Sequence, residues 1–121
     1  MNYPYFSEDE LRCRCGCGRA DMDDDFMAKL IALREECDFP FIINSGYRCQ
    51  KHDRAVGGAG NHTQGRAVDI RVSGHRAFAL LSMAAAMGMT GIGVKQTGPH
   101  KQRFIHLDDL DSSIRPWVWS Y

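Results

Sequence analysis

The sequence has no long apolar run and no excess of either charge. None of its segments approaches the ~18 consecutive apolar residues that a membrane-spanning helix needs, so we expect no insertion into a membrane. Fifteen basic and fifteen acidic side chains give a formal net charge of zero. The chain therefore lacks the positive charge with which nucleic-acid-binding proteins attract phosphates, and we expect neither DNA nor RNA as a partner.

The first residues also lack the pattern of a secretory leader, so we expect no signal peptide. The first residues, MNYPYFSEDEL, are polar and acidic, whereas a signal peptide begins with basic residues and continues with apolar ones. This predicts a chain that is cytoplasmic as synthesised. A chain in that compartment normally keeps its thiols reduced.

The cysteines are odd in number, so they cannot all pair within the chain: Cys13, Cys15, Cys17, Cys37 and Cys49. Three interpretations stay open, namely buried free thiols, one or two disulfides formed after release from the cell, and a structural metal site. In the last, the first three would bind metal with Cys37 or Cys49. The C-x-C-x-C spacing differs from the paired C-x2-C knuckles that are typical of zinc sites.

The length of 121 residues fits one compact domain, without a linker or an internal repeat. Hydrophobic residues at 44% and charged residues at 25% are ordinary for a globular protein. We expect a single domain over residues 1–121, acting as a monomer. Its segment 1–21, which contains the Cys/Gly run, is expected to be irregular.

Hydrophobic periodicity and turn residues predict the order of helices and strands. Ser7 and Glu10 have the spacing of a capping box, which predicts a short helical turn. The predicted elements that follow are an amphipathic helix over 22–36, a strand over 39–44, a long polar loop over 48–65, a strand over 67–72, a well-buried helix over 75–87, strands over 91–96 and 103–108, and a last extended segment over 117–121 that lays its aromatic side chains on one face. This order is typical of an α+β domain with a small, mostly antiparallel sheet and flanking helices.

Three residues have the side chains that a catalytic zinc needs. Such an ion takes about three protein ligands with nitrogen, oxygen or sulfur donors and leaves a position for water. His62 lies in the predicted loop, Asp69 on one strand and His106 on a distant strand. In the strand 67–72 the apolar side chains alternate with Asp69, which places the carboxylate opposite the packing face. Spacing alone does not separate these histidines from ordinary core or surface residues.

Four short motifs occur in an order that identifies a family: SGYR (45–48), VGG (56–58), HTQGRAVDI (62–70) and FIHLD (104–108). Together they resemble the M15 family of zinc peptidases, which includes D-alanyl-D-alanine carboxypeptidases and phage endolysins such as L-alanyl-D-glutamate peptidases, and which shares its fold with hedgehog signalling domains. The resemblance spans residues 39–121.

The resemblance implies a Zn²⁺ ion bound by His62, Asp69 and His106, with the stem peptides of peptidoglycan as substrate. It also implies that Arg48 faces the active site and holds a substrate carbonyl or carboxylate. The chemistry agrees, because zinc activates water and polarises a carbonyl while a planar guanidinium stabilises an oxyanion. The alternative for Arg48 is a structural salt bridge.

The general base is not predicted by the resemblance. Several branches of the family place Glu or Asp three residues before the last zinc ligand, where this chain has Arg103, and another places His two residues before it, where this chain has Phe104. Asp108 points to the same side of a strand as His106, so it is a candidate base or a partner that orients a ligand. His100, in the preceding loop, is the other candidate base.

Two functions follow as hypotheses. The first is hydrolysis of a peptide bond in peptidoglycan, by a carboxypeptidase or by an endopeptidase of the endolysin type. The missing leader suits a phage endolysin, which acts on the wall after release. The second is a zinc-containing module that binds peptide or cell wall without cutting it.

Overall fold

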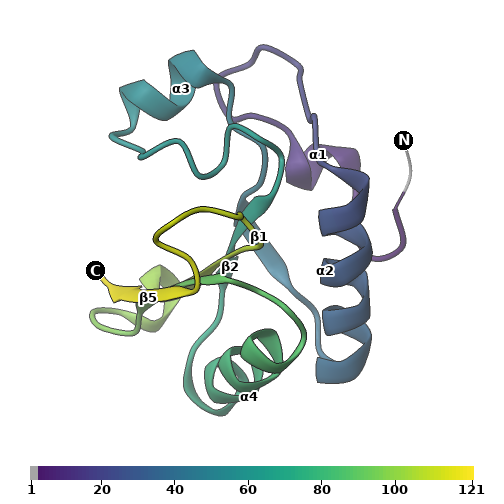
Figure 1. Cartoon of the computed structure of the whole chain (residues 1–121), viewed down its shortest axis with the longest axis vertical. Coiled ribbons are helices and arrows are strands. Elements are labelled where there is room, and N and C mark those ends of the chain that lie inside the picture. The colour runs from purple at the N-terminus through teal and green to yellow at the C-terminus, as the bar shows by residue number, and fades with distance from the viewer. Residues whose placement is uncertain (1–2) are drawn as a thin grey trace.

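The computed structural model describes residues 3–121 and has an α+β architecture, as predicted (Figure 1). One mixed sheet contains five strands in the order β1-β2-β4-β3-β5. The strands are β1 (Ile42–Ser45), β2 (Ala67–Arg71), β3 (Gly91–Lys95), β4 (Phe104–Asp108) and β5 (Trp117–Ser120). Neighbouring strands run antiparallel except β3 and β5, which are parallel. The prediction of a mostly antiparallel sheet is therefore confirmed.

The helices are α1 (Glu8–Leu11), α2 (Asp24–Cys37), α3 (Gln50–Ala55), α4 (Gly74–Ala86) and the short 3₁₀ helix η1 (His100–Gln102). Helix α1 begins with the predicted capping box, in which the Ser7 hydroxyl accepts from the Glu10 N–H and the Glu10 carboxylate accepts from the Ser7 N–H. Helix α2 begins after its N-cap Asp23, whose carboxylate accepts from the N–H of Phe26. Within residues 3–121, no helix is both long enough and apolar enough to cross a membrane.

Helix α3 corrects the prediction of a continuous loop over residues 48–65. It has six residues and follows Cys49, which is its N-cap. Asp53 is its one buried residue. A helix that buries a carboxylate and no apolar side chain has no hydrophobic periodicity, which explains why the sequence pattern missed it.

Apolar side chains from α2, α4 and the sheet form one buried cluster. From the sheet this cluster takes alternate residues, among them Val68 and Ile70 of β2 and Ile105 and Leu107 of β4. The prediction that α4 is well buried is wrong. Only Ala77, Leu80 and Ala84 of this helix are buried, and Phe78 is 75% exposed.

The intervening residues of the strands form a row across the other face of the sheet. In the register of the sheet, His106 of β4 lies between Asp69 of β2 and Gly93 of β3, and Gly93 pairs with Trp119 of β5. The Trp119 ring centroid lies 5.0 Å from that of His106, and Tyr121 lies 4.9 Å from Phe104. This face of the sheet thus places Asp69 and His106 beside three aromatic rings.

Candidate metal centre

His62, Asp69 and His106 meet on this face of the sheet. Each offers one donor atom, and the three donor atoms all lie within 4.8 Å of one another. Asp69 and His106 are direct cross-strand partners in the β2–β4 ladder. His62 comes from the segment after α3, which is joined to the SGYR turn by a hydrogen bond from the Arg48 N–H to the His62 carbonyl. All three side chains are buried.

Each imidazole has one nitrogen held by a protein group and the other directed at Asp69. The Nδ1 of His62 lies 2.8 Å from the Gly46 carbonyl, while its Nε2 is 3.3 Å from Asp69 Oδ1. The Nε2 of His106 lies 2.7 Å from Asp108 Oδ2, while its Nδ1 is 2.9 Å from the same Asp69 oxygen. Metal-binding histidines typically hold their second nitrogen in this way, against a carbonyl or carboxylate. Two imidazoles and a carboxylate fit a zinc ion by their donor chemistry.

The charges in the cluster favour ionised side chains. Burial acts to raise the pKa of Asp69, but hydrogen bonds with His106 and His62 outweigh it and hold that pKa well below its usual value. Burial acts to lower the pKa of His106, but hydrogen bonds to Asp108 and Asp69 outweigh it and raise that pKa. His106 thus lies between two carboxylates, and both favour its protonated form.

Arg48 lies beside the cluster and is fixed from three sides. Its Nε donates to the Ser45 hydroxyl at 3.1 Å, and its two Nη atoms lie 3.2 Å from Asp53 Oδ1 and 3.4 Å from Asp69 Oδ2. The guanidinium thus makes the structural ion pairs that were the alternative for this residue. It also lines the cavity beside His62, Asp69 and His106, so the geometry allows both roles.

That cavity has a volume of about 300 Å³. Besides the three donors and Arg48, it is lined by small residues after α3 and by aromatic residues of the sheet face: Val56, Gly57, Gly58, Ala59, Asn61, Phe104, Trp119 and Tyr121. The metal-type donors are therefore accessible to a small substrate group.

Asp108 lies behind His106 and does not line the cavity. Its side chain is fully buried and accepts hydrogen bonds from His106, from Arg115 at 3.1 and 3.0 Å, and from the Leu110 N–H. Burial acts to raise the pKa of Asp108, but His106 and Arg115 outweigh it and lower that pKa to about 2. Of the two roles left open by the sequence, this geometry favours orientation of His106.

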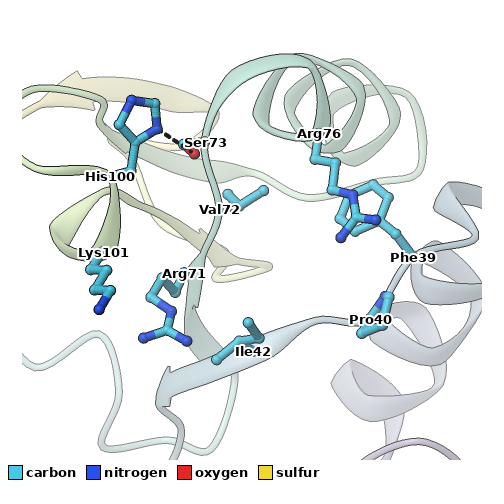
Figure 2. Close-up of a pocket in the computed structure, with 9 residues that line it drawn as sticks. All are labelled: Phe39, Pro40, Ile42, Arg71, Val72, Ser73, Arg76, His100 and Lys101. Carbon is cyan, nitrogen blue, oxygen red and sulfur yellow. Dashed lines mark hydrogen bonds between the residues drawn. The ribbon is translucent and has the colours of Figure 1, made fainter.

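His100 lies away from the metal-type donors. It belongs to η1, and its Nδ1 is 3.2 Å from the Ser73 hydroxyl. It lines a different pocket, together with Phe39, Arg71 and Arg76 (Figure 2). Arg103 donates to the Gly98 carbonyl and lines neither of these two cavities. The structure does not bring His100 to the site where a base would act.

Two glycines of β3 make room for side chains at the site, those of Trp119 and Asp108. A Cβ on Gly93 would lie 2.5 Å from Trp119 Nε1, and a Cβ on Gly91 would lie 2.3 Å from the Asp108 carboxylate. Both glycines therefore let a neighbouring side chain cross the strand closely. Arg115, stacked over Trp119 and paired with Asp108, was not predicted at this site. The G-x-G spacing in β3 is the signal from which this close packing could have been predicted.

Comparison with known proteins provides one match. A family model described as Peptidase M15 matches residues 4–108, which is most of the chain. A search of curated proteins found no match.

Proposed function

This chain belongs to the peptidase M15 family, a family of metallopeptidases, and from that premise we propose that it hydrolyses a peptide bond in the stem or crosslink of bacterial peptidoglycan. The proposed cofactor is one zinc ion bound by His62, Asp69 and His106. The observation that carries this proposal is the convergence of these donors beside a cavity that Arg48 also lines. The partner would be the stem peptide, as a carboxypeptidase or an endopeptidase substrate.

The ligand atoms follow from the hydrogen bonds. The Nε2 of His62 and the Nδ1 of His106 are the nitrogens that face Asp69, so these two and a carboxylate oxygen would hold the ion. A set of three protein ligands is typical of catalytic zinc, whereas structural zinc usually takes four. A zinc ion held there would lower the pKa of a coordinated water and polarise the scissile carbonyl.

Arg48 would bind the substrate. Its guanidinium lines the cavity, and the contacts with Ser45, Asp53 and Asp69 fix its orientation before substrate arrives. A preorganised cation of this kind stabilises the negative charge that develops on a carbonyl oxygen during peptide hydrolysis, or binds a terminal carboxylate. The first role would support an endopeptidase and a carboxypeptidase alike, and the second only a carboxypeptidase.

Tyr121 would donate a proton or a hydrogen bond to the substrate from the cavity wall. Tyr121 lines the cavity, and partial burial raises its pKa, so its phenol stays protonated and is a hydrogen-bond donor near neutral pH. Asp108 would keep His106 oriented with Nδ1 toward the ion.

A second candidate function rests on a specific observation. Among residues 3–121, Asp69 has the one side-chain carboxylate that lines this cavity, and it contacts both histidines and Arg48. Metallopeptidases commonly use a separate carboxylate as general base. This favours, as the alternative, a module that binds a wall peptide through zinc and Arg48 without cutting it.

Digestion of purified peptidoglycan tests the two candidates. Protein depleted of metal with a chelator, the same protein reloaded with zinc, and an Asp69→Ala variant would be compared. We expect soluble fragments or free D-alanine only from the zinc-loaded wild type, and mass spectrometry of the products would identify the bond. Sedimentation with the wall, without product release, would instead support the binding module. Zinc-loaded protein that neither cuts nor binds the wall would overturn both.

A further inference from the structure

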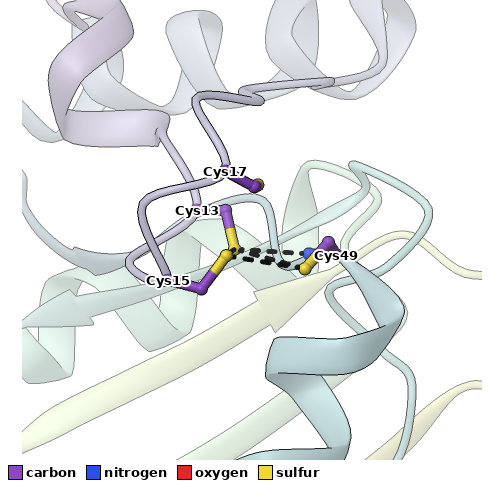
Figure 3. Close-up of side chains that lie close together, drawn as sticks. All are labelled: Cys13, Cys15, Cys17 and Cys49. Carbon is purple, nitrogen blue, oxygen red and sulfur yellow. Dashed lines mark hydrogen bonds between the residues drawn. The ribbon is translucent and has the colours of Figure 1, made fainter.

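Four of the five cysteines form a second cluster of metal-type donors. Cys13, Cys15 and Cys17 lie on the loop that follows α1, and Cys49 is the N-cap of α3. The four sulfur atoms all lie within 4.8 Å of one another. Figure 3 shows the thiols of Cys13, Cys15 and Cys49 in one group, with Cys17 next to it. The cluster joins segments more than thirty residues apart in the sequence.

The distances between the sulfur atoms match those between the ligands of a tetrahedral metal site. Cys13 and Cys15 are 3.4 Å apart, Cys13 and Cys49 are 3.8 Å apart, and Cys15 and Cys49 are 3.7 Å apart. A disulfide would hold two sulfurs at about 2.05 Å. Four sulfurs around a tetrahedral zinc ion, with Zn–S bonds of about 2.3 Å, lie about 3.8 Å from one another. The thiols are free and have the separation of ligands that share one ion.

We propose that Cys13, Cys15, Cys17 and Cys49 bind a structural zinc ion, distinct from the ion proposed for the histidines. The complete set of four protein ligands is the arrangement of structural zinc sites. Of the two alternatives for the fourth ligand, the geometry selects Cys49, because Cys37 lies on α2 and does not belong to the cluster.

The backbone around the thiols supports thiolate ligands. The Cys49 N–H donates to Cys13 Sγ and the His52 N–H donates to Cys49 Sγ, both at 3.4 Å. Such hydrogen bonds favour the charged form of a sulfur and orient it. A hydrogen bond from the Cys13 N–H to the Arg19 carbonyl, at 2.8 Å, closes the loop that carries the first three cysteines. The loop therefore holds its thiols toward Cys49.

An ion in this position would tie the N-terminal segment to the SGYR turn. The Tyr47 N–H already donates to the Leu11 carbonyl at 3.0 Å, and a Cβ on Gly46 would lie 2.9 Å from Leu11 Cα. Cys49 directly follows Arg48, and the Gly46 carbonyl holds His62. Helix α1 has only four residues and little stability of its own. We infer that the ion clamps this segment against the turn that supplies two contacts of the histidine site.

Metal content and cobalt spectroscopy on the full chain, purified under reducing conditions, test the proposal. We expect two zinc ions per chain, and we expect Co²⁺-substituted protein to show the thiolate-to-cobalt charge-transfer absorption that a His-Asp-His site lacks. A Cys15→Ser/Cys17→Ser double variant should lose this absorption and one of its two zinc ions. Both residues are exposed, so their replacement leaves the apolar core intact.

Matched variants separate this result from the histidine site and from misfolding. Cys37→Ser should keep both ions and the absorption, and His62→Ala should keep the absorption while losing one ion. Circular dichroism would confirm that each variant is folded. The proposal is overturned if folded wild type shows no thiolate band, or if the double variant keeps it. A disulfide among these four cysteines in the zinc-containing protein, detected by mass spectrometry without reductant, would overturn it as well.

Discussion

The histidine cluster and the cysteine cluster differ in which part of the fold positions them. Asp69 and His106 are fixed by adjacent strands, and each histidine is held by a further protein group, the Gly46 carbonyl or the Asp108 carboxylate. The cysteines come from a loop and a helix N-cap, and the N–H groups that contact them belong to Cys49 and His52. The first cluster takes two of its three residues from adjacent strands, whereas all four cysteines of the second lie outside the strands.

The difference in donors has a chemical consequence. Three donors beside a cavity leave room for water and substrate, which suits catalysis, whereas four thiolates complete a tetrahedral shell and leave none. The turn over residues 46–49 links the two, because it holds His62, carries Arg48 and ends at Cys49. We therefore expect loss of the histidine cluster to reduce mainly the rate of hydrolysis, and loss of the cysteine cluster to reduce mainly the stability of the fold.

The largest expected effect comes from emptying the two clusters separately. His62→Ala should abolish hydrolysis, because the ion loses a ligand. Its thermal midpoint should fall less than that of the cysteine variant. Cys15→Ser/Cys17→Ser should retain measurable hydrolysis but lower the midpoint by at least about 5 °C, because a structural metal contributes directly to folding. Calorimetry and a product assay on both variants would check this. Equal loss of activity and stability in both would remove the distinction between the clusters.

Arg48→Lys should lower the rate of hydrolysis by about 10²–10³-fold, the usual cost of removing one donor that stabilises an oxyanion. Lysine keeps the charge but loses the planar fork and its contacts with Asp53 and Asp69. Steady-state kinetics would separate a fall in kcat, expected for an oxyanion role, from a rise in KM, expected for binding of a terminal carboxylate. Arg103→Lys is the matched control, since Arg103 lies outside the cavity. An unchanged rate in Arg48→Lys would exclude both roles.

Asp108→Asn should weaken zinc binding at the histidine cluster by about 10–100-fold, the usual effect of losing a partner that orients a metal ligand. The amide oxygen of asparagine can still accept a hydrogen bond from His106 Nε2, but it lacks the negative charge of the carboxylate. Asp109→Asn is the matched control, because Asp109 is a buried neighbour that pairs with Lys29 and Arg66 and contacts neither histidine. It should lower stability and leave zinc affinity unchanged. Competition with a zinc-binding dye would measure both, and equal affinities in the two variants would contradict the orienting role.

Part of the candidate metal centre could be predicted from the sequence, because strand alternation is a local property. Alternating apolar residues in β2 predict that Asp69 lies on the face opposite the core, and the ladder brings Asp69 into direct register with His106 of β4. The order of the motifs identified the M15 family, which the family model confirms. The predicted α+β fold class is confirmed as well, because the periodicity of its helices and strands is also local.

The missed features depend on contacts between distant segments. Arg115 and Trp119 reach the site only because β5 pairs in parallel with β3, which no local pattern predicts. Asp53, which holds Arg48, lies on a helix without an apolar face. The choice between Cys37 and Cys49 likewise depends on how the N-terminal segment packs against the SGYR turn. Local periodicity predicts which face of a strand a residue lies on. Packing between distant segments decides which other side chains lie next to that residue.

The smallest expected effect, a pH dependence, also differs between the two clusters. Because contacts with Asp108 and Asp69 raise the pKa of His106 in the metal-free protein, a zinc ion must displace a proton from Nδ1. Below that raised pKa, zinc affinity at the histidine cluster should fall by up to about tenfold per pH unit, and above it the dependence should disappear.

Calorimetry in buffers of different ionisation enthalpy would count the protons released. The Cys15→Ser/Cys17→Ser variant, which keeps the histidine cluster, should release about one proton per zinc ion at a pH below the His106 pKa. The His62→Ala variant, which keeps the thiols, should release more than one, because binding by four thiolates requires several protonated thiols to lose their protons. A count near zero for the Cys15→Ser/Cys17→Ser variant would show that His106 is already neutral before the ion binds, and equal counts for the two variants would contradict the expected difference between their donors.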